Sequence, residues 1–294
     1  MKISKFIVAN GIWSIEREFS KNLRYYQELI MSKHVTLSIS IVVYQKYNDT
    51  LLAIESIERF TNSGISKKIY IVDNSTISDD NPSKQSFLSA LAKYDDVEYK
   101  DTKKNIGFGK GHNYVLSELD SDIHAIINPD IVLNSDVFSS LIDFLNKRPD
   151  VGMTAPILTD EQGNIQQVFR RELTIYDLIC RYIRLRPFDN RYNYHTMMDI
   201  NKTKDFECPF IQGSFLLIRT SLLKEVNGFD KRYFMYVEDA DLCKTIRQKA
   251  KIVVHPCEKV MHRWERASHV DFKLMSIHAK SLFRYFCKWG WKLW

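Results

Sequence analysis

The stretch LSISIVVYQKYNDTLLAIESIERFTNSGISKKIYIVDNS, residues 37–75, decides the expected fold. It begins with a strand, 37–44, whose second half is an apolar run typical of strands that are buried on both faces. Apolar residues at helical spacing follow over 48–60, and a second apolar strand, 68–72, ends at the polar residues 73–75. A strand, a helix and a strand in this order indicate a parallel sheet with helical crossovers.

The same alternation continues downstream. Further strands are expected at 97–99, 124–127 and 152–156, with a helix over 135–146. Because ligands of such sheets bind at the carboxyl ends of the strands, the polar residues after each strand are the candidate site. The stretch 170–208 is basic and aromatic without a regular pattern, and we expect it to form irregular loops over the site.

Composition and charge describe a folded globular chain with two basic segments. The 294 residues are 45% hydrophobic and 27% charged, which is too apolar for a disordered protein. The net charge is +6. Residues 265–294 carry six basic and two acidic residues, and residues 170–191 carry six basic and three acidic residues, so the rest is about neutral. This distribution indicates an anionic partner: nucleic acid, a membrane surface or a phosphorylated substrate.

The cysteines and the apolar runs bear on the compartment. Five scattered cysteines without a C-x-x-C pair give neither a disulfide framework nor a zinc site, which favours a reducing compartment. No run approaches the roughly 20 apolar residues of a spanning helix. The apolar stretch 6–9 is too short for a signal-peptide core. We therefore expect a cytoplasmic protein that does not cross a membrane.

Two motifs follow predicted strands. Asn128-Pro129-Asp130 places a carboxylate just past a buried strand, where it could hold Mg²⁺ or Mn²⁺, or could satisfy its own turn. Residues 105–113 have glycines in a G-x-G-x-G spacing that matches neither the dinucleotide fingerprint nor the P-loop. A close approach to a ligand and a tight turn into a helix explain these glycines equally well.

A third region combines a glycine with carboxylates. Gly213 lies in a strand-like segment, 208–218, where it would let a backbone or a sugar come close. Glu238 and Asp239 directly follow an aromatic run, where a partly desolvated carboxylate could act as a base. Acidic residues at the start of a helix also favour the helix dipole, so a purely structural role is the alternative.

The C-terminal tail is predicted to be a helix. Over 272–294, a stripe of Lys273, Lys280, Arg284 and Lys288 adjoins an apolar face rich in Trp. A basic, Trp-rich amphipathic helix favours an anionic bilayer surface. The alternative is a helix that packs on the domain with its lysines in water.

The ordered motifs together resemble one family. They are Asp73-Asn74-Ser75, Asn105-x-Gly107-Phe108-Gly109, Asn128-Pro129-Asp130-Ile131, Gly213-Ser214-Phe215, Asn227-Gly228-Phe229-Asp230 and Glu238-Asp239-x-Asp241-Leu242-Cys243, with His262 and Ser268 downstream. Over about residues 37–286 the sequence resembles the bacterial family 2 glycosyltransferases, in particular the rhamnosyltransferase-like branch that builds O-antigen and other surface polysaccharides.

The resemblance implies an α/β fold of the GT-A type, with a mostly parallel, Rossmann-like sheet flanked by helices. The expected domains are an N-terminal helical extension, 1–34, a GT-A domain, 35–264, and a basic amphipathic C-terminal helix, 265–294. The implied reaction is an inverting transfer from a nucleotide-diphosphate sugar to a saccharide acceptor.

The resemblance also implies residue roles. Asp239 would be the catalytic base, with Glu238 a close contender, and Asp241 would support the start of the helix. The nucleotide sugar would contact Tyr44, Asp73, Asn105, Gly107, Phe108, Asn128 and Asp130. The acceptor would contact Gln212, Gly213, Ser214 and Tyr236. Asp130 and His262 would hold a divalent cation, Mg²⁺ or Mn²⁺, although a lone histidine is more often structural. The metal motif has no first Asp and so supplies one carboxylate.

The donor expected from the family branch is dTDP-rhamnose, with UDP-linked hexoses or galactofuranose as alternatives. The acceptor is expected to be linked to a lipid diphosphate at the inner face of the plasma membrane, where segment 170–191 would meet the diphosphate. Nucleic acid is then no longer the expected partner. A dinucleotide-dependent oxidoreductase would need the missing fingerprint. A non-catalytic membrane- or nucleotide-binding module would leave the acidic residues 238–241 unexplained.

Overall fold

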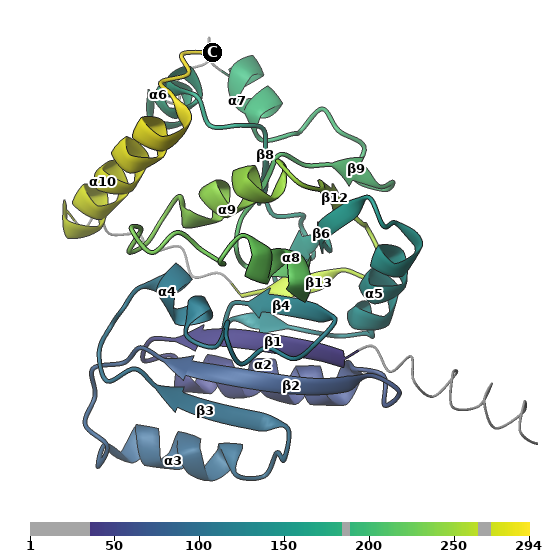
Figure 1. Cartoon of the computed structure of the whole chain (residues 1–294), viewed down its shortest axis with the longest axis vertical. Helices are drawn as coiled ribbons and strands as arrows, with labels where there is room; N and C mark the ends of the chain where they lie inside the picture. The colour runs from purple at the N-terminus through teal and green to yellow at the C-terminus, as the bar shows by residue number, and fades with distance from the viewer. Residues whose placement is uncertain (1–35, 184–188, 264–271) are drawn as a thin grey trace, which may run out of the picture. The chain divides into compact units, whose positions relative to one another are not determined.

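The computed structural model describes residues 36–183, 189–263 and 272–294, and the expected extension over 1–34 lies outside them. Its largest sheet has eight strands in the order β3-β2-β1-β4-β11-β6-β12-β9 (Figure 1). These strands are β1 (Thr36–Val43), β2 (Ser66–Asp73), β3 (Val97–Asp101), β4 (Ile123–Ile127), β6 (Val151–Ala155), β9 (Phe206–Glu207), β11 (Phe215–Arg219) and β12 (Lys251–Val254).

The strand directions confirm the predicted α/β fold with a mostly parallel sheet. β1 pairs in parallel with β2 and β4, β2 with β3, and β12 with β6. β11 is antiparallel to both β4 and β6, and β9 is antiparallel to β12. The register sets Val43 opposite Asp73 and Asp73 opposite Asp101, so the carboxyl ends of β1, β2 and β3 lie level at one edge.

Two small sheets accompany the large one. One joins β5 (Ile131–Val132), β13 (Val260–His262) and β7 (Leu158–Thr159). The other joins β8 (Phe169–Arg170) to β10 (Phe210–Ile211). The segment predicted as one strand over 208–218 is therefore broken, and residues 212–214 cross from β10 to β11. That crossing provides part of the site described below.

The helices follow the predicted alternation in the first half of the chain and add to it in the second. They are α2 (Tyr47–Phe60), α3 (Pro82–Leu91), α4 (Phe108–Asn113), α5 (Val137–Lys147), α6 (Ile175–Ile183), α7 (Asp189–His195), α8 (Thr220–Glu225), α9 (Glu238–Ile246) and α10 (Phe272–Trp289). α5 shows how sequence determines such a helix, because Phe138, Leu141 and Leu145 recur at helical spacing and are fully buried.

The prediction of irregular loops over 170–208 is wrong, because α6 and α7 lie there. Thr174 caps α6: its Oγ1 accepts from the N–H of Asp177 at 3.1 Å and donates to the Asp177 carboxylate at 2.6 Å. Arg191 donates to the same carboxylate and so ties α7 to α6. The sequence contains this capping pattern, Thr174 followed three residues later by Asp177, but our prediction was based on the basic and aromatic composition of the segment and did not use it.

The end of the chain packs against α6, beside α10 (Figure 1). The backbone N–H groups of Ile175 and Tyr176 donate to the carbonyls of Lys292 and Leu293 at 3.0 and 3.1 Å. These are first-turn N–H groups of α6, which have no partner within their own helix. The C-terminal residues therefore complete α6, far away in sequence.

Candidate active site

The loop before α4 is held against the segment that leads to α9. Gly107 has a φ of +91°, and a Cβ there would lie 2.1 Å from the carbonyl oxygen of Phe234, so only glycine fits. The N–H of Phe108 donates to that same carbonyl at 3.1 Å. Asn74 donates to the Gly107 carbonyl, and Asn105 accepts from the Gly107 N–H, both at 3.0 Å. The motif residues thus join the loop before α4 to the end of β2 and to the segment before α9.

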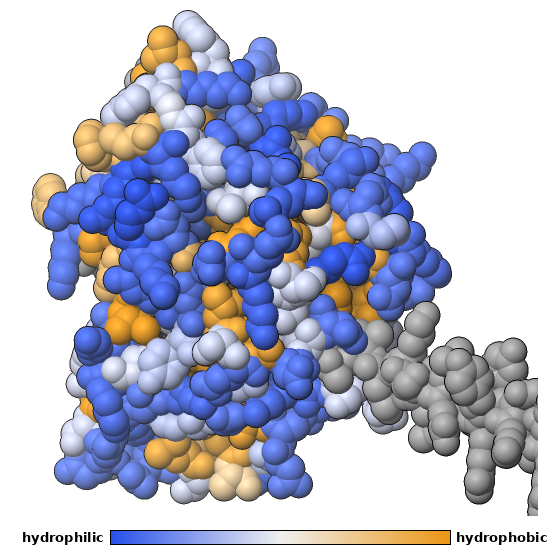
Figure 2. Space-filling model, viewed as in Figure 1, coloured by the Kyte–Doolittle hydropathy of each residue, from blue (hydrophilic) through white to orange (hydrophobic). Residues whose placement is uncertain are grey.

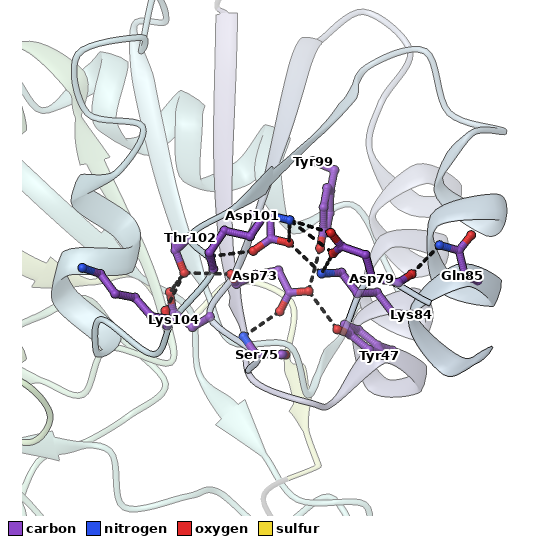
Figure 3. Close-up of polar contacts among 12 residues, drawn as sticks. Tyr47, Asp73, Ser75, Asp79, Lys84, Gln85, Tyr99, Asp101, Thr102 and Lys104 are labelled. Carbon is purple, nitrogen blue, oxygen red and sulfur yellow. Dashed lines mark hydrogen bonds and ion pairs between the residues drawn. The ribbon is translucent and has the colours of Figure 1, made fainter. Parts of the chain in front are cut away.

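Asp73, at the end of β2, is fully buried and occupied by donors (Figure 3). Its Oδ2 accepts from the hydroxyls of Tyr47 and Tyr99 at 2.8 and 2.7 Å, and its Oδ1 accepts from the N–H of Ser75 at 2.8 Å. Burial and then the Asp73 contact raise the pKa of Tyr99, so that its hydroxyl stays a donor. Three of the roughly four acceptor positions of this carboxylate are thus used within the protein.

Asp73 and its three donors, Tyr47, Tyr99 and Ser75, form a group that we call the anchor. A buried ammonium group lies next to it (Figure 3). Lys84 of α3 is 2% exposed, and its Nζ lies 2.6 Å from Asp101 and 2.7 Å from Asp79. Burial alone would lower the pKa of Lys84, but the contacts with Asp101 and Asp79 raise it above the usual value. The pairing fixes α3 to the end of β3.

Asp130 and His262 are brought together by the pairing of β5 with β13, in which Ile131 lies opposite His262. The Oδ1 of Asp130 lies 3.3 Å from Nε2 of His262 and accepts no hydrogen bond from the described residues. Gln166 fixes the ring: its amide donates to the His262 carbonyl at 2.8 Å, and its Oε1 contacts Nδ1 at 2.6 Å. Since an amide oxygen only accepts, Nδ1 donates a hydrogen to Gln166, and Nε2 is the ring nitrogen that faces Asp130.

Glu238 and Asp239 begin α9 and differ in their contacts. Asp239 is half-buried, and its carboxylate accepts from the N–H of Gly213 at 3.1 Å and from the N–H of Ala240 at 2.9 Å. Glu238 is 4% exposed, and its Oε2 has no hydrogen-bond partner among the described residues. Asp239 is therefore oriented by the backbone, whereas Glu238 is a buried carboxyl that lacks a donor.

Both carboxyls hold protons more tightly than usual. Burial, and then the charge of Asp239, raises the pKa of Glu238 to about 8. Burial also raises the pKa of Asp239, although the N–H groups of Gly213 and Ala240 and the charge of Arg170 oppose this. Raised carboxyl pKa values in a cavity are typical of groups that accept a proton near neutral pH.

The backbone that leads into α9 is strained. Tyr236 and Val237 have φ angles of 68° and 69°, in the left-handed region that β-branched residues rarely adopt. Strain of this kind persists only where surrounding contacts enforce it, and it is common at active sites. Nothing in the sequence pattern indicated it.

These elements surround a cavity of about 640 Å³. Its polar lining comprises Asn128, Arg170, Arg181, Gln212, Ser214, Tyr236, Glu238, Asp239 and His278, with Gly213 at the Asp239 contact. Its apolar lining comprises Phe108, Leu173, Leu178, Phe210, Met235, Val237, Leu274, Met275 and Leu282. A backbone bond of 2.9 Å from Asn128 to Ser214 ties the strand-end turn to the crossing at 212–214.

The structure brings one group of predicted site residues together and leaves another outside. Phe108, Asn128, Gln212, Gly213, Ser214, Tyr236, Glu238 and Asp239 line the cavity. Tyr44 is 46% exposed after β1, Asp73 and Gly107 are engaged with the protein as described, and Asn105 supports Gly107. Asp130 and His262 form their own pair. The predicted roles of all these residues stay predictions.

Two residues of the site escaped the sequence analysis. No sequence pattern indicated a role for Gln166, because a single glutamine is typical of any protein surface. Only the fold brings its side chain into contact with His262. Arg170 was only one of several basic residues in its segment. Arg171 and Arg191 of that segment form ion pairs with Asp199 and Asp177, whereas Arg170 is buried in the cavity wall.

α10 is anchored on the domain through Asp241. Its Lys288 and Trp289 donate to the Asp241 carboxylate at 2.8 and 2.7 Å, and Tyr233 donates to it at 3.3 Å. Lys288, which we placed in an outward basic stripe, therefore points at the protein. Asp241, which we expected to support the start of α9, lies in the first turn of that helix and in addition binds α10. Among the helices described, none combines the length and the apolarity needed to cross a bilayer.

Other proteins share this arrangement. The model of the family described as Glycosyl transferase family 2 matches residues 38–226. The N-acetylglucosaminyl-diphospho-decaprenol L-rhamnosyltransferase of Mycobacterium tuberculosis is 26% identical over 210 residues, 66% of this chain and 68% of the relative. Rhamnosyltransferase WbbL of Escherichia coli K12 is 28% identical over 201 residues, 62% of this chain and 70% of the relative.

Solved structures share the fold at lower identity. GalNAc-T7 with UDP, GalNAc and Mn²⁺ superposes with a TM-score of 0.64 at 14% identity, over 86% of this chain and 48% of that chain. The mannosyltransferase PcManGT of Pyrobaculum calidifontis, in complex with GDP-Man and Mn²⁺, gives 0.57 at 12% identity, over 86% and 63%. This chain thus spans about half the length of the first structure. The family match and these homologues identify the chain as a member of glycosyltransferase family 2 with the GT-A fold, and as a hexosyltransferase whose relatives include rhamnosyltransferases.

Proposed function

We propose that this protein is an inverting glycosyltransferase that moves L-rhamnose from dTDP-rhamnose to a saccharide on a lipid diphosphate. The observation that carries the proposal is Asp239: a carboxylate with a raised pKa, oriented by the Gly213 N–H, in the same cavity as Asn128 of the strand-end turn. That cavity can hold a sugar donor and an acceptor hydroxyl side by side.

In this mechanism Asp239 accepts the proton of the acceptor hydroxyl as the oxygen attacks the anomeric carbon. The bond between that carbon and the donor diphosphate breaks on the opposite side, so the configuration inverts and no covalent enzyme intermediate forms. The cavity positions both substrates, and its apolar lining limits the access of water. The N–H groups of Gly213 and Ala240 keep the carboxylate aimed while it changes charge.

A divalent cation fits the Asp130–His262 pair. A buried carboxylate oxygen without a hydrogen bond, and an imidazole whose tautomer Gln166 sets, are an oxygen and a nitrogen donor suited to Mg²⁺ or Mn²⁺. Among residues 36–183, 189–263 and 272–294 no cluster of three such side chains exists, so the donor phosphates and water would supply the other ligands. The cation, when bound, would offset the charge that develops on the leaving diphosphate.

The names of the relatives support the choice of substrates. Two of them are named rhamnosyltransferases, and one name specifies an acceptor joined to decaprenol through a diphosphate. Structural neighbours hold UDP and GDP-Man, so a UDP-sugar is the competing donor. For this chain we therefore propose a rhamnose donor and an acceptor saccharide that is joined to a lipid through a diphosphate.

The exposed apolar residues of the C-terminal region support attachment to the inner face of the plasma membrane. Phe272, Met275 and Phe283 of α10 are at least half exposed, as are Trp291 and Trp294 after it. In Figure 2, orange side chains mix with blue ones along the edge where α10 lies. Apolar side chains among lysines are the pattern of a helix that rests on an anionic bilayer.

The donor is tested by thermal shift with dTDP-rhamnose, UDP-galactose, UDP-glucose and GDP-mannose, each with and without Mn²⁺. A ligand at about 100 times its dissociation constant stabilises the fold by roughly 2.7 kcal/mol, which is readily measured. We expect the largest shift with dTDP-rhamnose and Mn²⁺. A larger shift with a UDP-sugar, together with transfer of that sugar, would replace rhamnose in the proposal.

The membrane contact is tested by sedimentation with phosphatidylglycerol vesicles and with phosphatidylcholine vesicles. We expect binding to the anionic vesicles that weakens in a Lys280→Glu/Trp294→Ala variant. Lys259→Glu, an exposed change outside α10, is the matched control. Equal binding of wild type and the double variant would contradict the role of this helix.

A further inference from the structure

Arg170 of β8 is a buried cation that the proposed transfer does not use. The residue is 8% exposed, and its Nη1 has no hydrogen-bond partner among the described residues. Its guanidinium carbon lies 5.7 Å from the centroid of the Phe210 ring, a contact that does not neutralise the charge. A buried, unpaired charge is strongly unfavourable, so an anion is the missing partner.

A second arginine lines the same cavity. Arg181 of α6 is close enough that its charge, after burial as the main cause, lowers the pKa of Arg170 to about 10. It acts on His278 of α10 in the same way, because burial and then Arg181 lower the pKa of that ring to about 4. The charge of Asp239 raises the pKa of Arg170 and so partly offsets these effects, but the hydrogen bonds of the Asp239 carboxylate go to the N–H groups of Gly213 and Ala240. Two like charges in one cavity favour the binding of an anion that contacts both.

The surroundings of the two arginines define the rest of the ligand. Beside them the wall is hydrocarbon, formed by Leu173, by Leu178 of α6, and by Leu274, Met275 and Leu282 of α10. A free phosphate would gain nothing from this wall. A phosphate that carries an apolar chain would match both parts.

We propose that Arg170 and Arg181 bind the phosphate groups that join the acceptor saccharide to its lipid, while the wall from α6 and α10 holds the first carbons of the chain. The inference rests on the proposed function and adds the location of the diphosphate. Since Arg170 and Asp239 line one cavity, the phosphate lies close to the hydroxyl that Asp239 deprotonates. The acceptor saccharide is therefore short, with few sugars between the diphosphate and the reacting hydroxyl.

The test is a calorimetric titration of the full chain with geranyl diphosphate, a soluble diphosphate with a ten-carbon chain. The protein is first saturated with Mn²⁺ and with dTDP or UDP, so that the donor side is filled. Geraniol and inorganic pyrophosphate are the comparison ligands. We expect Arg170→Gln and Arg181→Gln each to weaken geranyl diphosphate binding by roughly 10- to 100-fold, since hydrogen bonds between charged groups are lost. Arg59→Gln, an exposed arginine of α2, is expected to change nothing.

The melting temperature of each variant shows whether a loss of binding results from a folding defect. Because Arg170 lacks a partner, we expect Arg170→Gln to melt no lower than wild type. If it does not fold, Arg181→Gln gives the same comparison. Equal affinity of wild type and the arginine variants for geranyl diphosphate would overturn the inference.

Four other outcomes are informative. A loss of dTDP or UDP affinity in Arg170→Gln, with geranyl diphosphate unaffected, would assign the arginine to the donor and overturn the inference. Pyrophosphate binding as tight as geranyl diphosphate binding would overturn the lipid part. Transfer by a wild type that binds no geranyl diphosphate would overturn the inference and leave the proposed function standing. If no sugar nucleotide is turned over, the proposed function fails, and the assignment of the phosphate to a glycosyl acceptor fails with it.

Discussion

The anchor at Asp73 and the cavity at Asp239 both contain buried ionisable groups, but these groups differ in their hydrogen-bond partners. Asp73 is fully buried and accepts from Tyr47, Tyr99 and Ser75 within the protein. In the cavity, Glu238 and Arg170 are also buried, yet each has an atom without a hydrogen-bond partner among the described residues. The anchor is complete by itself, whereas the cavity is complete only with a ligand.

The backbone follows the same division. The end of β2 continues a regular parallel ladder, with Asp73 opposite Val43. The approach to α9 passes through two left-handed residues, Tyr236 and Val237. Folding stability is thus concentrated in the anchor, and strain and unpaired charge in the cavity, where substrate binding can relieve them. Substitutions in the two regions should therefore differ in kind.

The largest effect is expected for Asp239→Asn. The amide cannot accept the acceptor proton, so transfer should fall by roughly 10³-fold, within the usual range for a general base. Binding of the nucleotide sugar, measured by thermal shift, should stay within twofold. Glu225→Gln, an exposed change on α8, is the control for an uninvolved carboxylate. Transfer within tenfold of wild type would assign the proton to another group.

The anchor should respond through stability. Asp73→Ala leaves two buried tyrosine hydroxyls and one N–H without their acceptor, and should lower the free energy of unfolding by about 3 kcal/mol in urea titrations. Asp80→Asn, exposed and nearby, should change it by less than about 0.5 kcal/mol. An Asp73→Ala protein of wild-type stability that fails to bind nucleotide would instead make Asp73 a ligand residue.

A smaller effect concerns pH. Asp239 acts as a base only when ionised, and its pKa is raised, so the rate should increase as pH rises through that raised pKa. Because the charge of Asp239 helps to raise the pKa of Glu238 to about 8, Glu238 is still protonated where Asp239 ionises, so Glu238→Gln should leave this limb of the profile in place. A limb that moves to lower pH by about one unit would instead show that Glu238 is ionised before Asp239.

The same substitution has a predicted sign for stability. Folding raises the pKa of Glu238 to about 8, so its ionisation opposes folding as pH rises from the unfolded value to the folded one. Glu238→Gln should therefore melt higher than wild type at pH 9, and this advantage should vanish near pH 4. If Glu238→Gln melted lower than wild type at pH 9, the claim that the ionised Glu238 carboxylate lacks a partner would be wrong.

The smallest effect is expected at the tether of α10. Trp289→Phe removes the indole N–H that donates to Asp241 and should lower the free energy of unfolding by about 1 kcal/mol. Because α10 forms part of the cavity wall, the KM for acceptor should rise more than the KM for donor. Trp291→Phe, at a ring that is 56% exposed, is the control. Equal changes in the KM values for donor and acceptor would show that α10 has no specific role in acceptor binding.

The elements from β1 to β4 and the family could be predicted from the residues alone. The apolar run of β1 and the helical spacing of α2 are local patterns, so their elements could be predicted from the residues they contain. The ordered motifs carried the family, because each glycine, amide and carboxylate keeps its place along the chain. Asp239 was placed in the site for this reason.

Which of these side chains have hydrogen-bond partners within the protein, and which can bind a ligand, depends on how distant segments pack. From the sequence, both Asp73 and Asp239 were predicted to be carboxylates of the site. In the structure, Tyr47 and Tyr99 come from other elements and donate hydrogen bonds to Asp73. Likewise, Arg170 differs from Arg171 only in its surroundings: Asp199 pairs with one, and the cavity isolates the other. A residue's own pattern fixes its secondary structure, whereas the partners that set its charge and reactivity come from distant parts of the chain, and packing alone brings them into contact.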